Sequence, residues 1–178
     1  MTTYAKAQPA PYLSRASRLK RNFIVQQGFA EPAAETCDRH YSALLFQPRL
    51  LGLAFVTASA LQLPAMFLAL GAILWWCVVA PPLNPFNAVY NLALAPSSGI
   101  TLTSSPGPRR FSQFLGGSFC LAIAAALTLG IRTTAIVLEA FLMAGTATML
   151  AGFCVGTVLF HVLRGRADVA RSTLPWAA

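Results

Sequence analysis

The sequence predicts an all-helical integral membrane protein with four transmembrane segments, arranged as two helical hairpins behind an extended basic N-terminal tail. Charged residues make up 10% of the 178 residues, whereas a soluble domain carries about 25%. The mean hydropathy is +0.61. Residues 48–80 form one apolar block with no charge after Arg49, and residues 111–163 form a second.

The composition also limits the classes of function. A net charge of +8 would suggest nucleic-acid binding in a soluble protein. Here the Lys and Arg residues lie almost wholly outside the apolar blocks, so they indicate membrane topology and contact with anionic lipids. The four cysteines form no Cys-x-x-Cys pair, so neither a disulfide framework nor a zinc site is expected.

Residues 1–47 are predicted to form a basic tail without a cleavable secretory signal, because no apolar stretch lies near the start. A short amphipathic helix is predicted from Ser14 to about Gln27. It is either solvated or lies on anionic headgroups or a partner subunit, and we favour the second alternative. The expected partner or lipid contacts are Arg15, Arg18, Lys20, Arg21 and Phe23.

The block 48–80 would be about 50 Å long as a single helix, whereas the hydrocarbon core of a bilayer is about 30 Å thick. Pro64 is unfavourable inside a helix, and Gln62 is the only strongly polar residue nearby. We therefore predict a turn at Gln62–Pro64 between helices at 48–62 and 64–80. Both helices are short for a full crossing.

Residues 81–110 are predicted to be a linker. Asn84 and Pro85 suit the start of a short interfacial helix. The second hairpin follows at 111–163, with a turn near Gly130 and Arg132 and a last helix that runs to about Leu163. Residues 164–178 are expected to form a short tail.

The distribution of basic residues favours four segments. Four crossings place every Lys and Arg except Arg132 on one side, whereas three crossings would move Arg109 and Arg110 to the other side. Positive residues collect on the cytoplasmic side of membrane proteins. We expect a multi-pass protein of the bacterial inner membrane with both termini in the cytoplasm.

The last predicted helix carries a small residue at every fourth position, a pattern that lets two helices approach closely in lipid. The partner is either another helix of this chain or another protein, and we favour a partner within the chain, at Gly116 and Gly117. The expected helix-packing residues are Ala140, Ala144, Thr148, Gly152 and Gly156.

Glu139 is the only acidic residue inside an apolar block. It either pairs with Arg132 near the membrane surface, which we favour, or takes part in transport, as ionisable groups in membranes often do. His40 and His161 have no carboxylate or thiol neighbours in the sequence, so we expect no metal site and no cofactor.

Two short motifs carry a family resemblance. GFCVGTVLF at 152–160 and PRRFSQ at 108–113 resemble segments of a bacterial family of small four-span membrane proteins of unknown function. That family carries a Phe-Cys-x-Gly-Cys pattern in its last helix. The resemblance covers about residues 44–164 and implies four spans. Cys154 matches the first cysteine of the pattern, whereas Thr157 replaces the second.

No catalytic motif appears in the sequence. We therefore predict a non-catalytic accessory subunit that stabilises a larger membrane complex, with a photosynthetic or respiratory assembly as an example of a host. Its partners would be other membrane subunits and anionic lipids, not nucleic acid or a soluble small-molecule substrate. The alternatives are a membrane thiol or sulfur-handling redox protein that uses Cys154, and a small transporter that uses Glu139.

Overall fold

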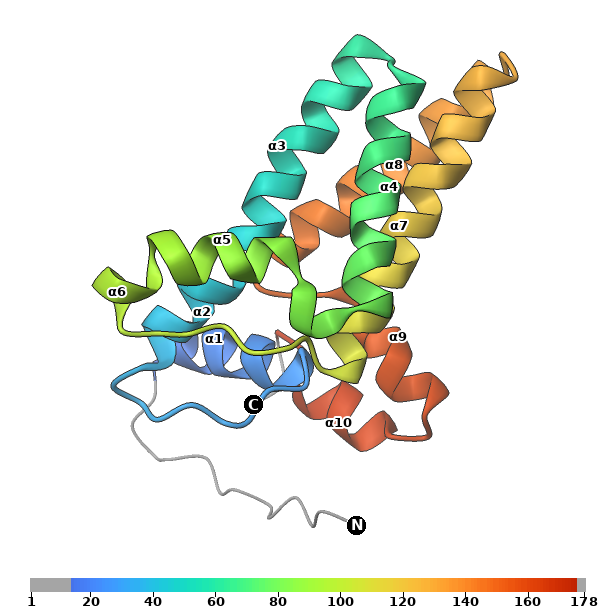
Figure 1. Ribbon diagram of the computed structural model, residues 1–178. Coiled ribbons are helices and arrows are strands. Elements are labelled where there is room, and N and C mark those ends of the chain that lie inside the picture. Colours follow the sequence, from blue (N-terminus) through green and yellow to red (C-terminus); the bar gives the residue numbers. More distant parts are fainter. Residues whose placement is uncertain (1–13, 176–178) are drawn as a thin grey trace.

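The computed structural model describes residues 14–175, and this part of the chain is helical and contains no strand (Figure 1). Its helices are α1 (Arg15–Gln26), α2 (Cys37–Leu44), α3 (Phe46–Leu61), α4 (Pro64–Val79), α5 (Pro85–Ala93), α6 (Ala95–Ser98), α7 (Gly107–Thr128), α8 (Arg132–Leu150), α9 (Val155–Leu163) and α10 (Ala167–Ser172), with a short 3₁₀ turn at Pro81–Leu83. Residues 1–13 of the predicted tail lie outside the described residues.

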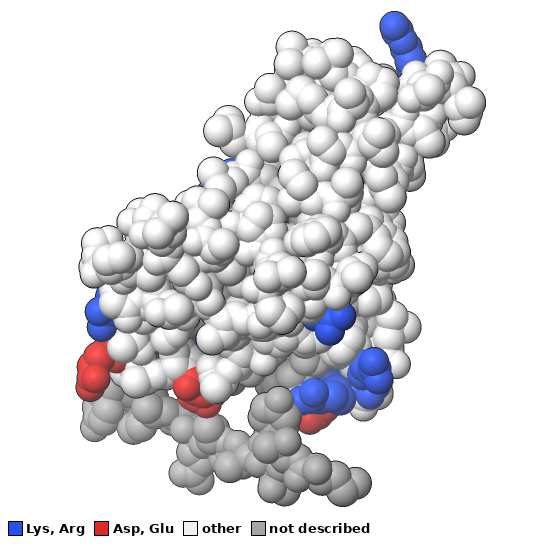
Figure 2. Space-filling view, viewed as in Figure 1, with Lys and Arg blue, Asp and Glu red and all other residues white. Residues whose placement is uncertain are grey.

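The helices form two regions. Helices α3, α4, α7 and α8 pack together as an elongated bundle, and the other six helices collect at one of its ends (Figure 1). We call these six helices the basal layer. Figure 2 shows charged side chains gathered over the basal layer and a broad uncharged surface over the bundle.

Within residues 14–175, three helical stretches are long and apolar enough to cross a membrane: Cys37–Leu61, which joins α2 and α3, Gly107–Thr128 and Arg132–Leu150. Their length and composition indicate a membrane protein. The fourth bundle helix, α4, is also apolar but has only 16 residues, a length of about 24 Å at 1.5 Å per residue.

The predicted break in the first block is confirmed. Helix α3 ends at Leu61, and Gln62 has left-handed backbone angles with φ of 49°. Pro64 then occupies the first turn of α4, where its missing N–H removes no helical hydrogen bond. Gly130 makes the turn between α7 and α8 with φ of +73°.

The tightest packing joins the two apolar blocks, because α4 lies mainly against α7 and α3 mainly against α8. Gly71 and Gly117 allow the close approach of α4 and α7. A Cβ added at Gly117 would lie 2.9 Å from Trp75 Cδ1 and 3.3 Å from the Gly71 carbonyl oxygen. Small residues do bring helices together here, as expected for Gly117, although the partner helix is α4.

The predicted small-residue ladder is wrong as a single helix face. Helix α8 ends at Leu150, and Gly152 adopts φ of +88° before α9 begins. An added Cβ at Gly152 would lie 2.4 Å from Leu19 Cδ2, so the chain bends where α1 approaches. Ala140 and Ala144 are exposed on α8 and Thr148 is half-buried, while Gly156 lies on α9 against Ser112.

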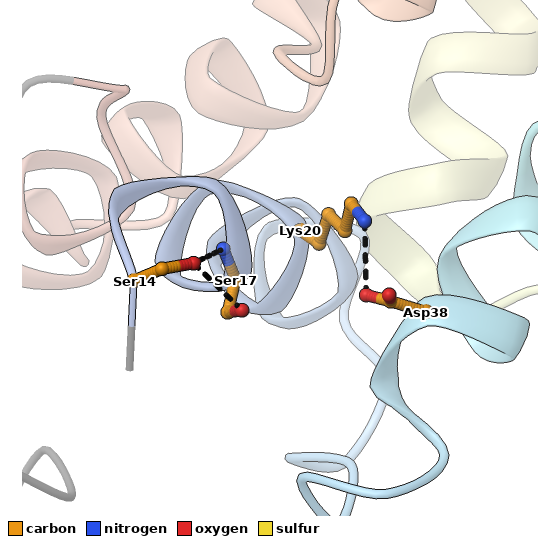
Figure 3. Close-up of polar contacts among 4 residues, drawn as sticks. All are labelled: Ser14, Ser17, Lys20 and Asp38. Atoms are coloured by element: carbon orange, nitrogen blue, oxygen red, sulfur yellow. Dashed lines mark hydrogen bonds and ion pairs between the residues drawn. The ribbon is translucent and has the colours of Figure 1, made fainter. Parts of the chain in front are cut away.

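The N-terminal helix is confirmed at Arg15–Gln26, with the Ser14 hydroxyl accepting from the Ser17 N–H at 3.2 Å (Figure 3). Phe23 is 1% exposed within the basal core, so its predicted role as a lipid or partner contact is wrong. The sequence indicates an amphipathic helix but does not show that the apolar side of this helix packs within the same chain.

The other predicted contacts of this helix divide into two groups. Lys20 pairs with Asp38 at 3.0 Å (Figure 3), and Arg21 pairs with Glu31. These bonds attach α1 to the segment that leads into the bundle. Arg15 and Arg18 remain exposed, and their contact with lipid or a partner stays a prediction.

Two further segments of the basal layer can be compared with expectation. The linker helix is confirmed as α5, and the Asn84 side chain accepts from the N–H groups of Phe86 and Asn87. The predicted C-terminal tail contains a helix, α10, at Ala167–Ser172. Six residues without an apolar periodicity gave no helix signal in the sequence, and contacts with α9 and α1 support α10 in the fold.

Candidate functional site

A cavity of about 280 Å³ lies between α3, α7, α8 and the start of α9. Its wall is mostly apolar and includes Leu51, Phe55, Phe119, Phe141 and Leu142. Its polar lining side chains include Gln47, Arg109 and Gln113. The volume lies near the lower end of the range typical of small-molecule sites.

The inner end of the cavity is polar and buried. Arg109 Nη2 donates to Gln47 Oε1 at 3.1 Å and to the Leu44 carbonyl oxygen at 3.4 Å. Gln113 Nε2 donates to the same oxygen of Gln47 at 3.1 Å. Arg109 is 2% exposed, and its guanidinium carbon lies 5.9 Å from the centre of the Phe29 ring.

The positive charge of Arg109 has no acidic partner. All five acidic residues of the chain fall within residues 14–175, and none of them pairs with Arg109. Among the described residues, Arg109 Nη1 also lacks a hydrogen-bond partner. An unpaired buried charge costs roughly several kcal/mol, so the site favours a negative group beside Nη1.

A thiol and a hydroxyl lie beside this polar end. Cys154 Sγ is 3.3 Å from Ser112 Oγ, and both residues line the cavity. Thr157, the residue at the second position of the cysteine pattern, is buried and donates to the Cys154 carbonyl oxygen at 2.8 Å. All four cysteines are free and buried, so the structure holds no disulfide that would indicate a thiol cycle.

Part of the cavity wall, on α8 and on the start of α9, reaches the outer surface of the molecule. Phe141 is 64% exposed, and Val155 and Leu159 are also exposed. Gly145 also lines the cavity, and an added Cβ there would meet no atom within 4 Å. The cavity therefore leads from a buried cation to an apolar opening on the side of the bundle, where lipid chains would surround a membrane protein.

A second group of buried polar side chains lies behind Cys154. Gln26 Oε1 accepts from the Cys154 N–H at 2.8 Å, and the Gln26 carbonyl oxygen is 3.1 Å from His161 Nε2. Burial lowers the pKa of His161 below its usual value. Gln27 is also buried, and neither polar atom of its side chain has a partner within residues 14–175.

The predicted ion pair of Glu139 with Arg132 is wrong. Glu139 is buried and accepts two hydrogen bonds from Gln62 Nε2, at 3.0 and 3.1 Å. Glu139 lies one turn of α8 from the buried Ala135, on the inner side of the helix. Its side chain points toward the bend after α3, where Gln62 lies. The bond joins α8 to the bend between α3 and α4.

Of the residues that the sequence singled out as sites, the cavity brings together Cys154 and Gly156. Sequence reasoning missed Arg109, Gln47 and Gln113 as site residues. Arg109 was interpreted only as a topology signal, although a charge inside the first turn of an apolar helix is itself a signal of an inward-facing group. No group of three metal-ligating side chains occurs in the described chain.

Comparison with known proteins places this sequence in a family. The model of a family described as "Domain of unknown function (DUF4395)" matches residues 42–164, a range that includes every residue lining the cavity. Comparisons with curated proteins and with solved structures give no match. Since the matched range covers more than half of the sequence, the chain belongs to the DUF4395 family, whose domain has no known function.

Proposed function

We propose that the protein is a non-catalytic membrane protein that binds one lipid-like, single-chain molecule in the cavity. The observation that carries the proposal is the course of the cavity, which runs from a buried polar end to an apolar opening on the bundle surface. A molecule with a small polar head and one alkyl chain has the same division between polar and apolar parts.

The dimensions support a single chain. The residues of α7 that line the cavity extend from Arg109 to Phe119, about 15 Å of helix at 1.5 Å per residue. An extended dodecyl chain fits this length. A phospholipid with two chains would need a wider space than about 280 Å³.

Binding of dodecanol to the full-length protein in nanodiscs tests the proposal. Gly145→Leu should lower the binding of dodecanol by at least about tenfold, because the new side chain occupies open space at the cavity mouth. Leucine also favours a helix more than glycine does, by up to about 1 kcal/mol. Loss of binding would therefore not reflect unfolding. Unchanged binding in Gly145→Leu, or no binding above empty nanodiscs, would contradict the proposal.

The accessory-subunit hypothesis is a second candidate, and the exposure of α8 favours it. In the most apolar 18-residue stretch of each candidate span, the buried share is 17% for Arg132–Leu150, 39% for Cys37–Leu61 and 33% for Gly107–Thr128. Ala140 and Ala144 lie on its exposed side, where a close-packing helix of another subunit would fit.

Ala144→Leu separates the two candidates. Ala144 does not line the cavity, so dodecanol binding should stay within about twofold of wild type. If α8 packs against another subunit, the same substitution should weaken the recovery of that subunit after mild detergent extraction. Recovery of only the single chain from wild-type membranes would remove the accessory-subunit candidate.

We further propose that all four bundle helices cross the membrane, with the basal layer on the cytoplasmic side. Helices α1 and α10 and the linker helix α5 lie at the same end of the bundle (Figure 1), and the basal layer holds most charges (Figure 2). A cysteine at Leu63 should then react with an impermeant reagent from the periplasmic side. Labelling from the cytoplasmic side would contradict four crossings.

A further inference from the structure

The buried cation at the inner end of the cavity identifies the head group of the bound molecule. We infer that the site binds a single-chain carboxylate, with the carboxylate against Arg109 Nη1 and the chain along α7 toward the opening. This inference rests on the proposed function, since it assigns a chemical class to the molecule that the cavity holds.

Arg109 is a buried cation with one donor nitrogen that has no partner in the described part of the chain. Two acceptors, Gln47 Oε1 and the Leu44 carbonyl oxygen, both bind Nη2. Nη1 is buried and has no partner among residues 14–175, and Arg109 is 2% exposed. An arginine side chain stays charged and cannot become neutral by losing a proton. A ligand that supplies an anionic oxygen satisfies both the charge and the open donor.

The donors at this end of the cavity suit a carboxylate better than a phosphate group. A phosphate group presents three strong acceptor oxygens and needs several donors. At its outer edge Arg109 offers only Nη1, because Nη2 already donates to the Leu44 carbonyl oxygen and to Gln47.

Of the other polar groups that line this end, Gln113 already donates to Gln47. The Ser112 hydroxyl lies within hydrogen-bond distance of the Pro108 carbonyl oxygen and of Cys154 Sγ. Gln113 Oε1 has no partner in the described chain but is an acceptor, so it offers no donor to an anion. A carboxylate presents two oxygens, and one of them can be satisfied by Nη1 alone.

The position of Arg109 along α7 determines where the head group would lie. Arg109 lies in the first turn of α7, next to the basal layer, while the apolar lining residue Phe119 lies further along the same helix. A bound carboxylate would therefore sit near the end of the bundle that carries the charged layer, and its chain would run toward the middle of the bundle. Lipids in a bilayer have the same orientation, with the charge near the surface.

The experiment compares radiolabelled dodecanoate, dodecanol and methyl dodecanoate with the full-length protein in nanodiscs of zwitterionic lipid at alkaline pH. Wild-type protein should bind the carboxylate at least about tenfold more tightly than the alcohol or the ester, because a hydrogen bond to a charged group contributes about 1.5–3 kcal/mol. This comparison needs no variant and stays valid if a substitution at Arg109 prevents folding.

Variants then locate the preference. Arg109→Gln should remove the preference, so that the carboxylate and the alcohol bind within about twofold of each other. Arg110→Gln is the matched control: it removes the same charge one residue away, on a side chain that binds the Val78 carbonyl oxygen outside the cavity. It should change carboxylate binding by less than about twofold.

The outcomes separate the two proposals. If no probe binds wild-type protein above empty nanodiscs, the proposed function fails and the inference fails with it. If the carboxylate, the alcohol and the ester bind equally, the proposed function stands and the carboxylate inference is wrong. If the preference for the carboxylate persists in Arg109→Gln, or disappears in Arg110→Gln, the assignment to Arg109 is wrong.

Discussion

The bundle and the basal end of the molecule hold together in opposite ways. The bundle has an uncharged outer surface, and its helices meet through apolar and very small side chains such as Gly71 and Gly117. The basal layer has a charged outer surface over an apolar core that also holds the buried polar side chains of Gln26 and His161, and the adjoining start of α7 adds the buried Arg109. The difference shows that close packing stabilises the part expected in lipid, whereas hydrogen bonds organise the part around the site.

The largest expected effect concerns the close packing of the bundle. Gly117→Leu should lower the free energy of unfolding by about 3 kcal/mol or more, because an added Cβ already lies 2.9 Å from Trp75 Cδ1. Reversible unfolding in mixed micelles would measure the change. Gly116→Ala is the control, since its added Cβ lies 3.5 Å from Leu74 Cδ1, an ordinary contact. Equal effects of the two variants would contradict the close approach of α4 and α7.

The second prediction concerns hydrogen bonding at the basal end. Gln26→Leu removes the acceptor of the Cys154 N–H and should cost about 2 kcal/mol, because a buried donor is left without a partner. Gln27→Leu is the matched control on the next residue, whose side-chain polar atoms have no partner in the described chain. It should be neutral or stabilising. A larger loss in Gln27→Leu than in Gln26→Leu would contradict this account of the basal interior.

The third prediction is a dependence of stability on pH. Since burial lowers the pKa of His161 in the folded state, the unfolded chain binds the proton more readily. Stability should be complete above the unfolded pKa of about 6.5 and should fall as the pH drops below it. Unfolding measured at pH values on both sides of that pKa would show the loss.

Variants at the two histidines of the chain assign the pH dependence. His161→Gln should reduce it, and His40→Gln should retain it. A dependence that persists in His161→Gln would show that another group is responsible.

The smallest expected effect lies at the bundle tip, where the Gln62–Glu139 bond joins α8 to the bend after α3. Glu139→Gln should cost only about 0.6 kcal/mol, the average for a polar contact between membrane helices. The same unfolding measurement applies, with Glu35→Gln on the exposed loop as the control. A loss as large as that of Gln26→Leu would remove the contrast between the two regions.

The helix boundaries that could be predicted from the sequence are those with a chemical signal. Pro64 and Asn84 marked the starts of α4 and α5, and Gly130 marked the turn before α8. The end of α8 was missed because Gly152 was interpreted as one member of a small-residue ladder in a continuous helix. Gly152 instead has a left-handed φ of +88°, which ends the helix, and the space beside it is occupied by Leu19 from a distant segment.

The site was less predictable than the helices. Cys154 was identified through its motif, and it does line the cavity. Arg109 and Gln113 lie four residues apart on α7, and their meeting with Gln47 depends on how α3 crosses α7. A sequence shows that these residues share one side of a helix, but it does not show which helix faces that side.

The position of α1 has a consequence for how the family domain is completed. Residues 15–26 precede the matched range 42–164, yet Gln26 occupies the hydrogen-bonding groups of Cys154 and His161, which lie inside that range. Phe29 then covers one side of the Arg109 guanidinium. A segment before the matched range therefore covers groups inside that range, and removal of residues 14–29 would leave the Cys154 N–H and one side of the Arg109 guanidinium without these contacts.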